Sequence, residues 1–304
     1  MRTTRIRHMV AVLGIAAAAT SAAQEEPQRE YVTGTFAGTQ VVNTHSVEVV
    51  PRKRSFGFMI QHRFGEVTPD EEAWNQFVGL DLPANIRFAF QYSPLRDVQL
   101  EVGRSKNEKT WDLGLKARVL KQTEENEMPV SVTVLGNAGF MSDRFPKVGE
   151  RDFFADGVTP FEYTLAHRFS YNTQIIVGRR FNRWFSAQVA GIAVYRNLVP
   201  VGGSNLTIAV AGATRFKVSP KGSILLEASP ILEGRQASEH REPVAIAYEV
   251  ATQGHVFQIV FASSQEIIEQ RLYPSPASHY DKGRFHLGFN IARTLFVKPK
   301  RTKN

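Results

Sequence analysis

The sequence predicts an all-β protein: an antiparallel, up-and-down transmembrane β-barrel of about twelve strands, with a range of roughly ten to fourteen. Three observations predict this fold. They are an export signal at the start of the chain, a period-two alternation of apolar and polar residues from Ser55 onward, and an alternation of long and short connections. An apolar run of the roughly 20 residues that a membrane helix needs does not occur after the export signal.

Residues 1–23 have the three parts of a secretory signal peptide. Arginines stand at positions 2, 5 and 7, residues 9–19 form an apolar stretch, and residues 21–23 are the small residues Ser-Ala-Ala. We expect cleavage before Gln24. The mature chain is therefore expected in the bacterial envelope, and a barrel that begins this way is expected in the outer membrane.

The period-two pattern indicates strands with one apolar and one polar face. In the segment 111–119, for example, the apolar residues Trp111 and Leu113 stand at odd positions, whereas the polar residues Asp112 and Lys116 stand at even positions. A barrel needs such strands because one face meets lipid and the other a polar lumen. The predicted strands are 54–64, 84–93, 97–105, 110–121, 129–140, 161–180, 183–196, 205–217, 222–229, 243–251, 254–262 and 283–296.

The connections between these strands are mostly long after odd-numbered strands and short after even-numbered ones. The exception is the second pair, in which the 106–109 gap is shorter than the 122–128 gap. Outer-membrane barrels have long outer loops and short periplasmic turns, so both chain ends are expected in the periplasm. Aromatic residues near the predicted strand ends suit the two membrane interfaces. These residues are Tyr92, Trp111, Phe140, Phe161, Phe181, Trp184, Tyr195 and Phe296.

The chain divides into a signal peptide (1–23), an N-terminal segment (24–53), the barrel (54–296) and a basic tail (297–304). The N-terminal segment is a periplasmic element, a further strand or a plug in the lumen, and the sequence leaves these alternatives open. The chain contains no cysteine, which excludes a disulfide-stapled scaffold. The net charge of +8 is concentrated at the two ends of the chain, so nucleic acid is not an expected partner.

Polar residues on the predicted inner face are candidates for the lining of the lumen. They carry both signs of charge, so they form either a self-satisfying network of ion pairs or the opposed walls of a polar passage. The candidates are Gln61, Arg63, Arg87, Glu101, Asp112, Lys116, Arg118, Glu227, Glu249 and Gln258.

No motif in the sequence predicts catalysis, a metal site or a cofactor. A phosphate loop, a zinc-protease motif and a Gly-x-Ser-x-Gly elbow are absent. A serine nucleophile needs a base within hydrogen-bond reach. His45 and Ser46 are adjacent, and His167 and Ser170 are three residues apart, so each pair faces opposite ways on a strand. We therefore expect a protein that is not an enzyme.

Several segments resemble a bacterial family of β-barrel proteins of unknown function, found mainly in the Bacteroidetes. The matching segments are 42–48, 60–65, 79–81, 85–87, 103–105, 109–113, 252–258 and 288–293. The resemblance implies an outer-membrane barrel without an assigned activity. Its motifs also suggest that His62, at the end of the first strand, and Asp81, in the loop that follows, order that loop by pairing across the barrel mouth.

The sequence predicts an outer-membrane barrel that acts as a narrow passive pore or a solute-uptake component, in contact with outer-membrane lipid. The first alternative is a closed barrel that anchors or scaffolds periplasmic partners. Its basic tail would then supply the contacts, through Lys298, Lys300, Arg301 and Lys303. A weaker alternative is a lipid-modifying barrel enzyme.

Overall fold

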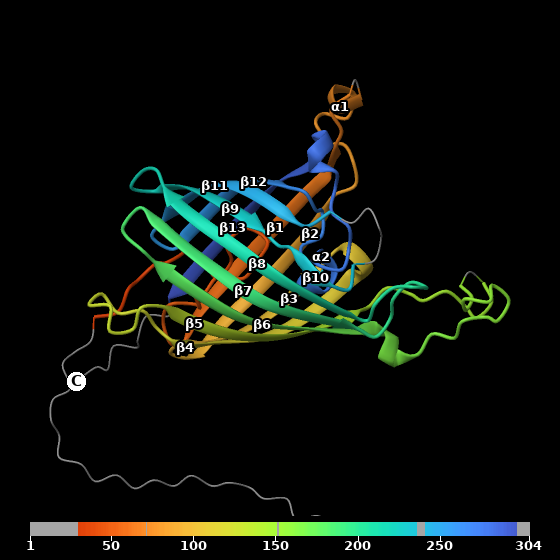
Figure 1. The fold of residues 1–304 in the computed structure, drawn as a ribbon, viewed down its shortest axis with the longest axis horizontal. Coiled ribbons are helices and arrows are strands. Elements are labelled where there is room, and N and C mark those ends of the chain that lie inside the picture. The colour runs from red at the N-terminus through yellow and green to blue at the C-terminus, as the bar shows by residue number, and fades with distance from the viewer. Residues whose placement is uncertain (1–29, 71, 151, 236–240, 297–304) are drawn as a thin grey trace, which may run out of the picture.

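In the computed structural model the predicted strands close into one antiparallel barrel (Figure 1). The structure describes residues 30–70, 72–150, 152–235 and 241–296, so the predicted signal peptide and basic tail lie outside the described residues. The barrel strands are β1 (Ser55–Val67), β2 (Asn85–Leu95), β3 (Val98–Ser105), β4 (Thr110–Leu120), β5 (Ser131–Met141), β6 (Phe169–Arg180), β7 (Phe185–Arg196), β8 (Leu206–Lys217), β9 (Gly222–Ala228), β11 (Val244–Thr252), β12 (His255–Ala262) and β13 (Phe285–Phe296).

Each barrel strand pairs with its neighbours along the chain, and the first strand pairs with the last. The β1–β13 register runs from Ser55 opposite Phe296 to Val67 opposite Phe285. This pairing closes the sheet, so the twelve-strand barrel that the sequence predicts is confirmed. The short strand β10 (Ile231–Glu233) pairs with β8 beyond the point where β9 ends, and it adds a thirteenth strand beside the ring.

The burial of side chains is inverted relative to a water-soluble barrel. In β4, Asp112 and Lys116 are buried, whereas Trp111 and Leu113 are 48% and 64% exposed. The same pattern of polar residues inside and apolar residues outside recurs around the ring. An apolar outer surface is stable against lipid and unfavourable in water, so the barrel spans a membrane.

The helices of the described chain are short. They are α1 (Glu72–Asn75), α2 (Glu269–Leu272) and three 3-10 turns, η1 (Asn107–Lys109), η2 (Leu165–Arg168) and η3 (Tyr280–Lys282). Within the part of the chain that the structure describes, none of them is long and apolar enough to cross a membrane.

The predicted strand boundaries agree with the structure except at β6. This strand begins at Phe169, so the predicted start at residue 161 is wrong. Residues 161–168 lie in the outer loop because Phe161 packs against Phe154 and Tyr163 instead of a neighbouring strand. A 3-10 turn with a capping box between Thr164 and His167 then leads into the strand. Phe161 is therefore not an interface aromatic.

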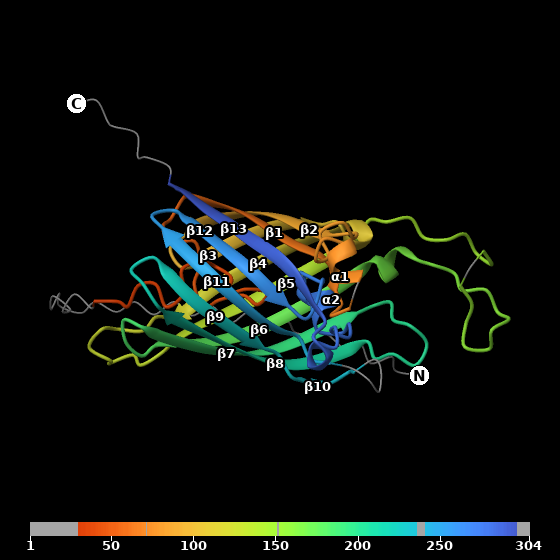
Figure 2. The ribbon, with the colours of Figure 1, turned by 90° about the horizontal axis from the view of Figure 1, so that it is seen from above.

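The connections gather at two different ends of the barrel. The turns at one end are short, as at Arg96–Asp97, except for the ten-residue β4–β5 connection, and the β1 and β13 termini meet there. The long connections emerge at the other end, and the loop before β6 extends well beyond the barrel in both views (Figures 1 and 2). The β12–β13 connection, in contrast, folds back so that residues such as Leu272 and Tyr273 become fully buried.

The first long loop, between β1 and β2, depends on a close approach of two glycines. The Gly65 N–H donates to the Gly79 carbonyl at 3.1 Å. Gly79 has a φ of +81°, and a Cβ there would lie 2.7 Å from the Gly65 oxygen. The loop therefore requires glycine at this position both for its backbone angle and for space.

We predict that Gly79→Ala opens this loop while the barrel stays folded. Limited proteolysis within residues 68–84 should accelerate by about tenfold, since the strained turn costs on the order of 1–2 kcal/mol. Gly202→Ala is the control, because Gly202 has a φ of +77° with no atom within 4 Å of an added Cβ. Equal cleavage of the 68–84 loop in both variants would contradict the steric argument.

Candidate functional site

The barrel interior is occupied by the N-terminal segment. We define the plug as residues 32–50, of which Val41, Val42 and Val47 have no exposed surface. Its centre is a tight hairpin, in which the Val41 N–H donates to the Thr44 carbonyl at 2.9 Å. The structure thus places this segment in the lumen, between the walls of the barrel.

The tip of the hairpin surrounds the carboxylate of Glu227, which projects inward from β9. The backbone N–H groups of Val42, Asn43 and Thr44 donate to this carboxylate over 2.7–3.2 Å, and the Thr44 hydroxyl donates at 2.7 Å. A tight turn leaves successive N–H groups without backbone partners, and such groups form a nest for an anion. Glu227 therefore serves as the main anchor of the plug on its strand.

Other inward side chains bind the plug through its backbone and its polar side chains. Lys116 of β4 donates to the carbonyls of Thr39 and Glu48, at 2.9 and 2.5 Å. Gln258 of β12 donates to the Val41 carbonyl at 2.6 Å. These contacts satisfy carbonyls that have no strand partner, as a buried backbone requires.

On β1, two candidates contact plug side chains directly. Arg63 donates to the Asn43 side chain at 2.7 Å and to Asn290 of β13 at 2.9 Å, and it is fully buried. Gln61 donates to the Gln40 side chain at 2.6 Å. The two side chains therefore join the plug to the closing seam of the barrel.

A second group of candidates forms an ion-pair cluster on β2, β3 and β4. Arg87 lies 2.6 Å from both Glu101 and Asp112, and all three side chains are almost fully buried. Both carboxylates share the same guanidinium, so each is paired although the three groups together carry one negative charge in excess. The arrangement therefore has the geometry of an ion-pair network, not of a basic wall facing an acidic one.

The two remaining charged candidates lie toward the short-turn end. Arg118 pairs with Asp97, at the β2–β3 turn, and with Glu48 of the plug at 2.7 Å. Glu249 of β11 pairs with Arg215 of β8 at 3.0 Å. Arg118 thus fixes the end of the plug near the place where the chain enters β1.

Strands β7 and β8 carry several small apolar side chains on their inner face, which the sequence analysis did not predict. Ala190, Ala209 and Ala211 are buried in one cluster with Phe36 and Val42 of the plug. The signal was present in the alanine- and glycine-rich segments 187–193 and 209–213, in which Gln188 is the only polar residue. Small side chains here leave room for the plug inside the ring.

The lumen is also closed from the long-loop end, by the segment that carries α2. Ile267, Leu272 and Tyr273 of this segment are buried. The His45 Nε2 atom of the plug lies 3.1 Å from a carboxylate oxygen of Glu269, with both side chains almost fully buried. The plug and the outer loop therefore meet inside the barrel at this pair.

The predicted pairing of His62 with Asp81 is not what the structure contains. The His62 ring faces outward and stacks on Phe289, with ring centroids 5.0 Å apart, whereas Asp81 is exposed in the loop. His62 and its inward neighbours alternate on β1, so a contact across the mouth would require the opposite face of the strand. The Gly65–Gly79 backbone contact orders the loop instead.

The structure does bring one serine and one histidine together, although sequence reasoning found no such pair. The Ser278 hydroxyl lies 3.1 Å from Nε2 of His286, and it also donates to Glu66. A serine hydroxyl has a single proton, so the bond to Glu66 competes with donation to a histidine base. The His286 Nδ1 atom contacts the Phe64 carbonyl, so the cluster ties the loop to β1 and β13.

Within residues 30–70, 72–150, 152–235 and 241–296, no three His, Asp or Glu side chains are grouped so that they could hold a metal ion. The polar groups of the lumen are instead directed at one another and at the plug. The chemistry that this arrangement offers is reversible hydrogen bonding between a fixed barrel and a segment inside it.

We predict that Glu227→Gln loosens the plug, because one carboxylate oxygen becomes an amide that cannot accept from the hairpin N–H groups. Hydrogen bonds to a charged group contribute roughly 1.5–3 kcal/mol each, so the effect should be large. Since the chain has no cysteine, the measurement is maleimide labelling of a buried Val47→Cys reporter. Labelling should accelerate about tenfold or more.

The control for this prediction is Glu233→Gln, which removes the same charge from an exposed position on β10. It should leave the labelling rate of the reporter unchanged. If Glu227→Gln labels no faster than this control, the carboxylate does not hold the plug.

Known proteins were compared with the chain at three levels. A search of curated proteins finds no match. Among solved structures, the NanC porin has 7% identity and a TM-score of 0.46, covering 80% of this chain and 100% of that one. The KdgM porin has 6% identity and a TM-score of 0.44, covering 80% and 99%. An outer-membrane channel from Pseudomonas putida F1 has 11% identity and a TM-score of 0.49, covering 82% and 98%.

The family comparison covers most of the chain. The family of membrane-bound β-barrel domains (DUF5777) matches residues 36–295, which include the buried part of the plug and the whole ring. The match begins at Phe36, inside the plug, and ends at Leu295, in the last strand. The chain therefore belongs to this family of membrane-bound β-barrel domains.

Proposed function

We propose that the protein is an outer-membrane solute-uptake barrel whose resting state is closed by its own plug. The long loops would face the outside, and the short turns and both chain ends would face the periplasm, as in bacterial outer-membrane barrels. Passage would require the plug to shift within the lumen. Of the two expectations, a passive pore and a solute-uptake component, this favours the second, because the plug and the α2 segment occupy the interior.

The observation that carries the proposal is the polar character of the contact between plug and wall. Glu227, Lys116 and Arg63 bind the plug through hydrogen bonds that water could replace. These groups satisfy the plug while it is in place, and the same groups remain hydrated when the plug moves. A lumen that fills with water when the plug moves requires polar walls.

The filled lumen equally favours the second candidate, a closed barrel that anchors or scaffolds periplasmic partners. In that case the basic residues Lys298, Lys300, Arg301 and Lys303 would supply the contact. They lie outside the described residues, so this role rests on their sequence alone. Binding of a periplasmic extract with and without residues 298–304 tests it.

We predict that wild-type protein in a planar bilayer gives rare, discrete current steps, and that fixing the plug abolishes them. A disulfide between Val47→Cys in the plug and Gly178→Cys in β6 would fix it. A Cβ at Gly178 would lie 3.0 Å from the Val47 Cβ, so a shift of about 0.5 Å reaches the usual disulfide spacing. Reduction of the bond should restore the steps.

The control is the single Val47→Cys variant under the same oxidant, which cannot form the bond because the chain has no other cysteine. Its steps should persist. Current steps that continue in the oxidised double variant would show that ion passage does not require the plug to move. A wild-type barrel that inserts and stays silent would exclude uptake and leave the anchor as the function.

A further inference from the structure

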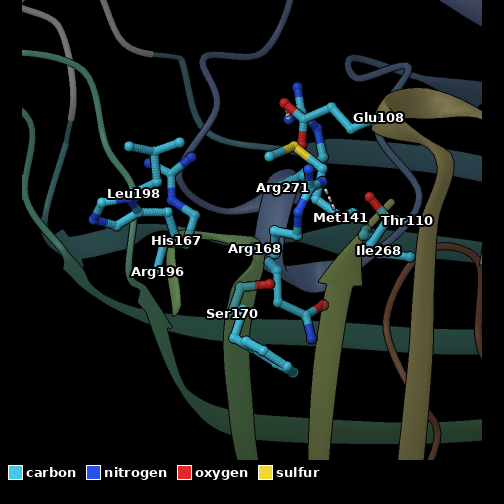
Figure 3. A pocket seen from close by; sticks show the side chains of 12 residues that line it. Glu108, Thr110, Met141, His167, Arg168, Ser170, Arg196, Leu198, Ile268 and Arg271 are labelled. Carbon is cyan, nitrogen blue, oxygen red and sulfur yellow. Dashed lines mark hydrogen bonds and ion pairs between the residues drawn. The ribbon is translucent and has the colours of Figure 1, made fainter. Parts of the chain in front are cut away.

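The rim of the barrel at the long-loop end holds a group of arginines around a small cavity (Figure 3). The cavity has a volume of about 80 Å³, and Arg168, Arg196 and Arg271 line it together with His167 and Glu108. These residues come from η2, the end of β7, α2 and η1, which the fold brings together above the lumen.

Two of the three arginines are committed to partners within the protein. Arg271 forms ion pairs with Glu108 and with Glu266, the latter at 3.0 Å. Arg168 donates to the carbonyls of Met141 and Asp143 and lies 4.0 Å from the centre of the Phe145 ring. Their positions are thus fixed by the structure without any ligand.

Arg196 differs from both. Its Nε and Nη2 atoms are buried, and neither has a hydrogen-bond partner among the described residues. Leaving buried donors of a charged group without an acceptor costs more than an ordinary lost hydrogen bond. Glu108 also lines this cavity but pairs with Arg271, as Glu266 does, so the three arginines and two glutamates leave one positive charge in excess. An anion in the cavity would balance it.

His167 adds a further donor to the same cavity. The Thr164 N–H donates to its Nδ1 atom at 3.0 Å. A neutral imidazole that accepts at Nδ1 carries its proton at Nε2. This second nitrogen is therefore a donor, and it suits an oxygen of the same anion that Arg196 would bind.

A larger cavity of about 810 Å³ adjoins the first, and the two share Glu108, Arg196, Leu198 and Arg271. Its remaining lining is mostly apolar, with Phe154, Phe161 and Val199 among the residues. This volume and this combination of apolar walls with a few polar groups are typical of sites for small molecules. Of the polar residues that belong to this cavity alone, Tyr163 donates to Asp152, so the apolar remainder of the lining fits an aromatic ring better than a hydroxylated sugar ring.

We propose that this rim site binds an aromatic carboxylate, with the carboxylate on Arg196 and His167 and the ring against Phe154 and Phe161, whose own rings are in contact. A planar guanidinium binds a carboxylate through two parallel hydrogen bonds, for which the unpaired Nε and Nη2 atoms of Arg196 are the matching donors. The role of this site in transport rests on the proposed uptake function. The site names the class of solute that the long-loop end of the barrel would bind.

The test measures binding to the refolded full-length protein in detergent, with 2-naphthoate as the fluorescent probe and 2-naphthylmethanol as its uncharged analogue. Wild-type protein should bind the acid about tenfold or more tightly than the alcohol. In Arg196→Gln the affinity for the acid should fall to that for the alcohol. The four affinities, of two proteins for two ligands, form a thermodynamic cycle that gives the coupling between guanidinium and carboxylate.

The control variant is Arg144→Gln, which removes the same charge from an exposed position on the same loop, away from both cavities. It should keep the wild-type preference for the acid. Phe154→Ala provides a second, independent variant, which should weaken acid and alcohol by the same factor because it removes ring contacts on the apolar lining.

Three results would overturn the proposal. They are equal binding of acid and alcohol by the wild type, an unchanged preference for the acid in Arg196→Gln, and glucuronate or inorganic phosphate that binds as tightly as naphthoate. Binding is measured without transport, so it separates this inference from the proposed function. A barrel that binds naphthoate but never conducts refutes uptake alone, and a conducting barrel that binds no naphthoate refutes the rim site alone.

Discussion

The structure depends on one constraint, which is that the hydrocarbon interior of a membrane offers no water to the backbone. Pairing of β1 with β13 removes the sheet edges and satisfies the strand N–H and C=O groups within the ring. The outward side chains must then be apolar, so the polar side chains of the strands point into the lumen. A ring of twelve strands is too wide for these side chains alone to fill, so the interior needs a further occupant.

The plug meets this need through its backbone. A segment without a sheet partner leaves N–H and C=O groups unpaired, and inward side chains such as Glu227 and Lys116 become their partners. Strands β7 and β8 contribute small apolar residues such as Ala190 and Ala211, which leave space for the plug and lie in one cluster with its valines. The plug is therefore held both by hydrogen bonds to inward polar side chains and by close packing against small apolar ones.

The long-loop end combines two roles in a single short helix. Glu269 of α2 lies against His45 of the plug, and Arg271, two residues later, lines the rim cavity beside Arg196. A ligand in that cavity would thus contact the same element that rests on the plug. The residue that contacts the plug and the residue that lines the proposed solute site are therefore neighbours on one helix, so coupling between the two sites would need no long chain of contacts.

The sequence determined the ring of strands. Lipid on one face imposes the period-two alternation on every strand, and the alternation of long and short connections can be seen along the chain. The sequence also placed residues such as Arg87 and Glu227 on the inner face. It misplaced the start of β6, where aromatic contacts within the loop compete with strand pairing. Only the tertiary structure decided that the N-terminal segment occupies the lumen, that Ser278 meets His286, and that Nε and Nη2 of Arg196 have no hydrogen-bond partner within the described part of the chain. Each of these depends on contacts between residues far apart in the chain, which local patterns do not encode.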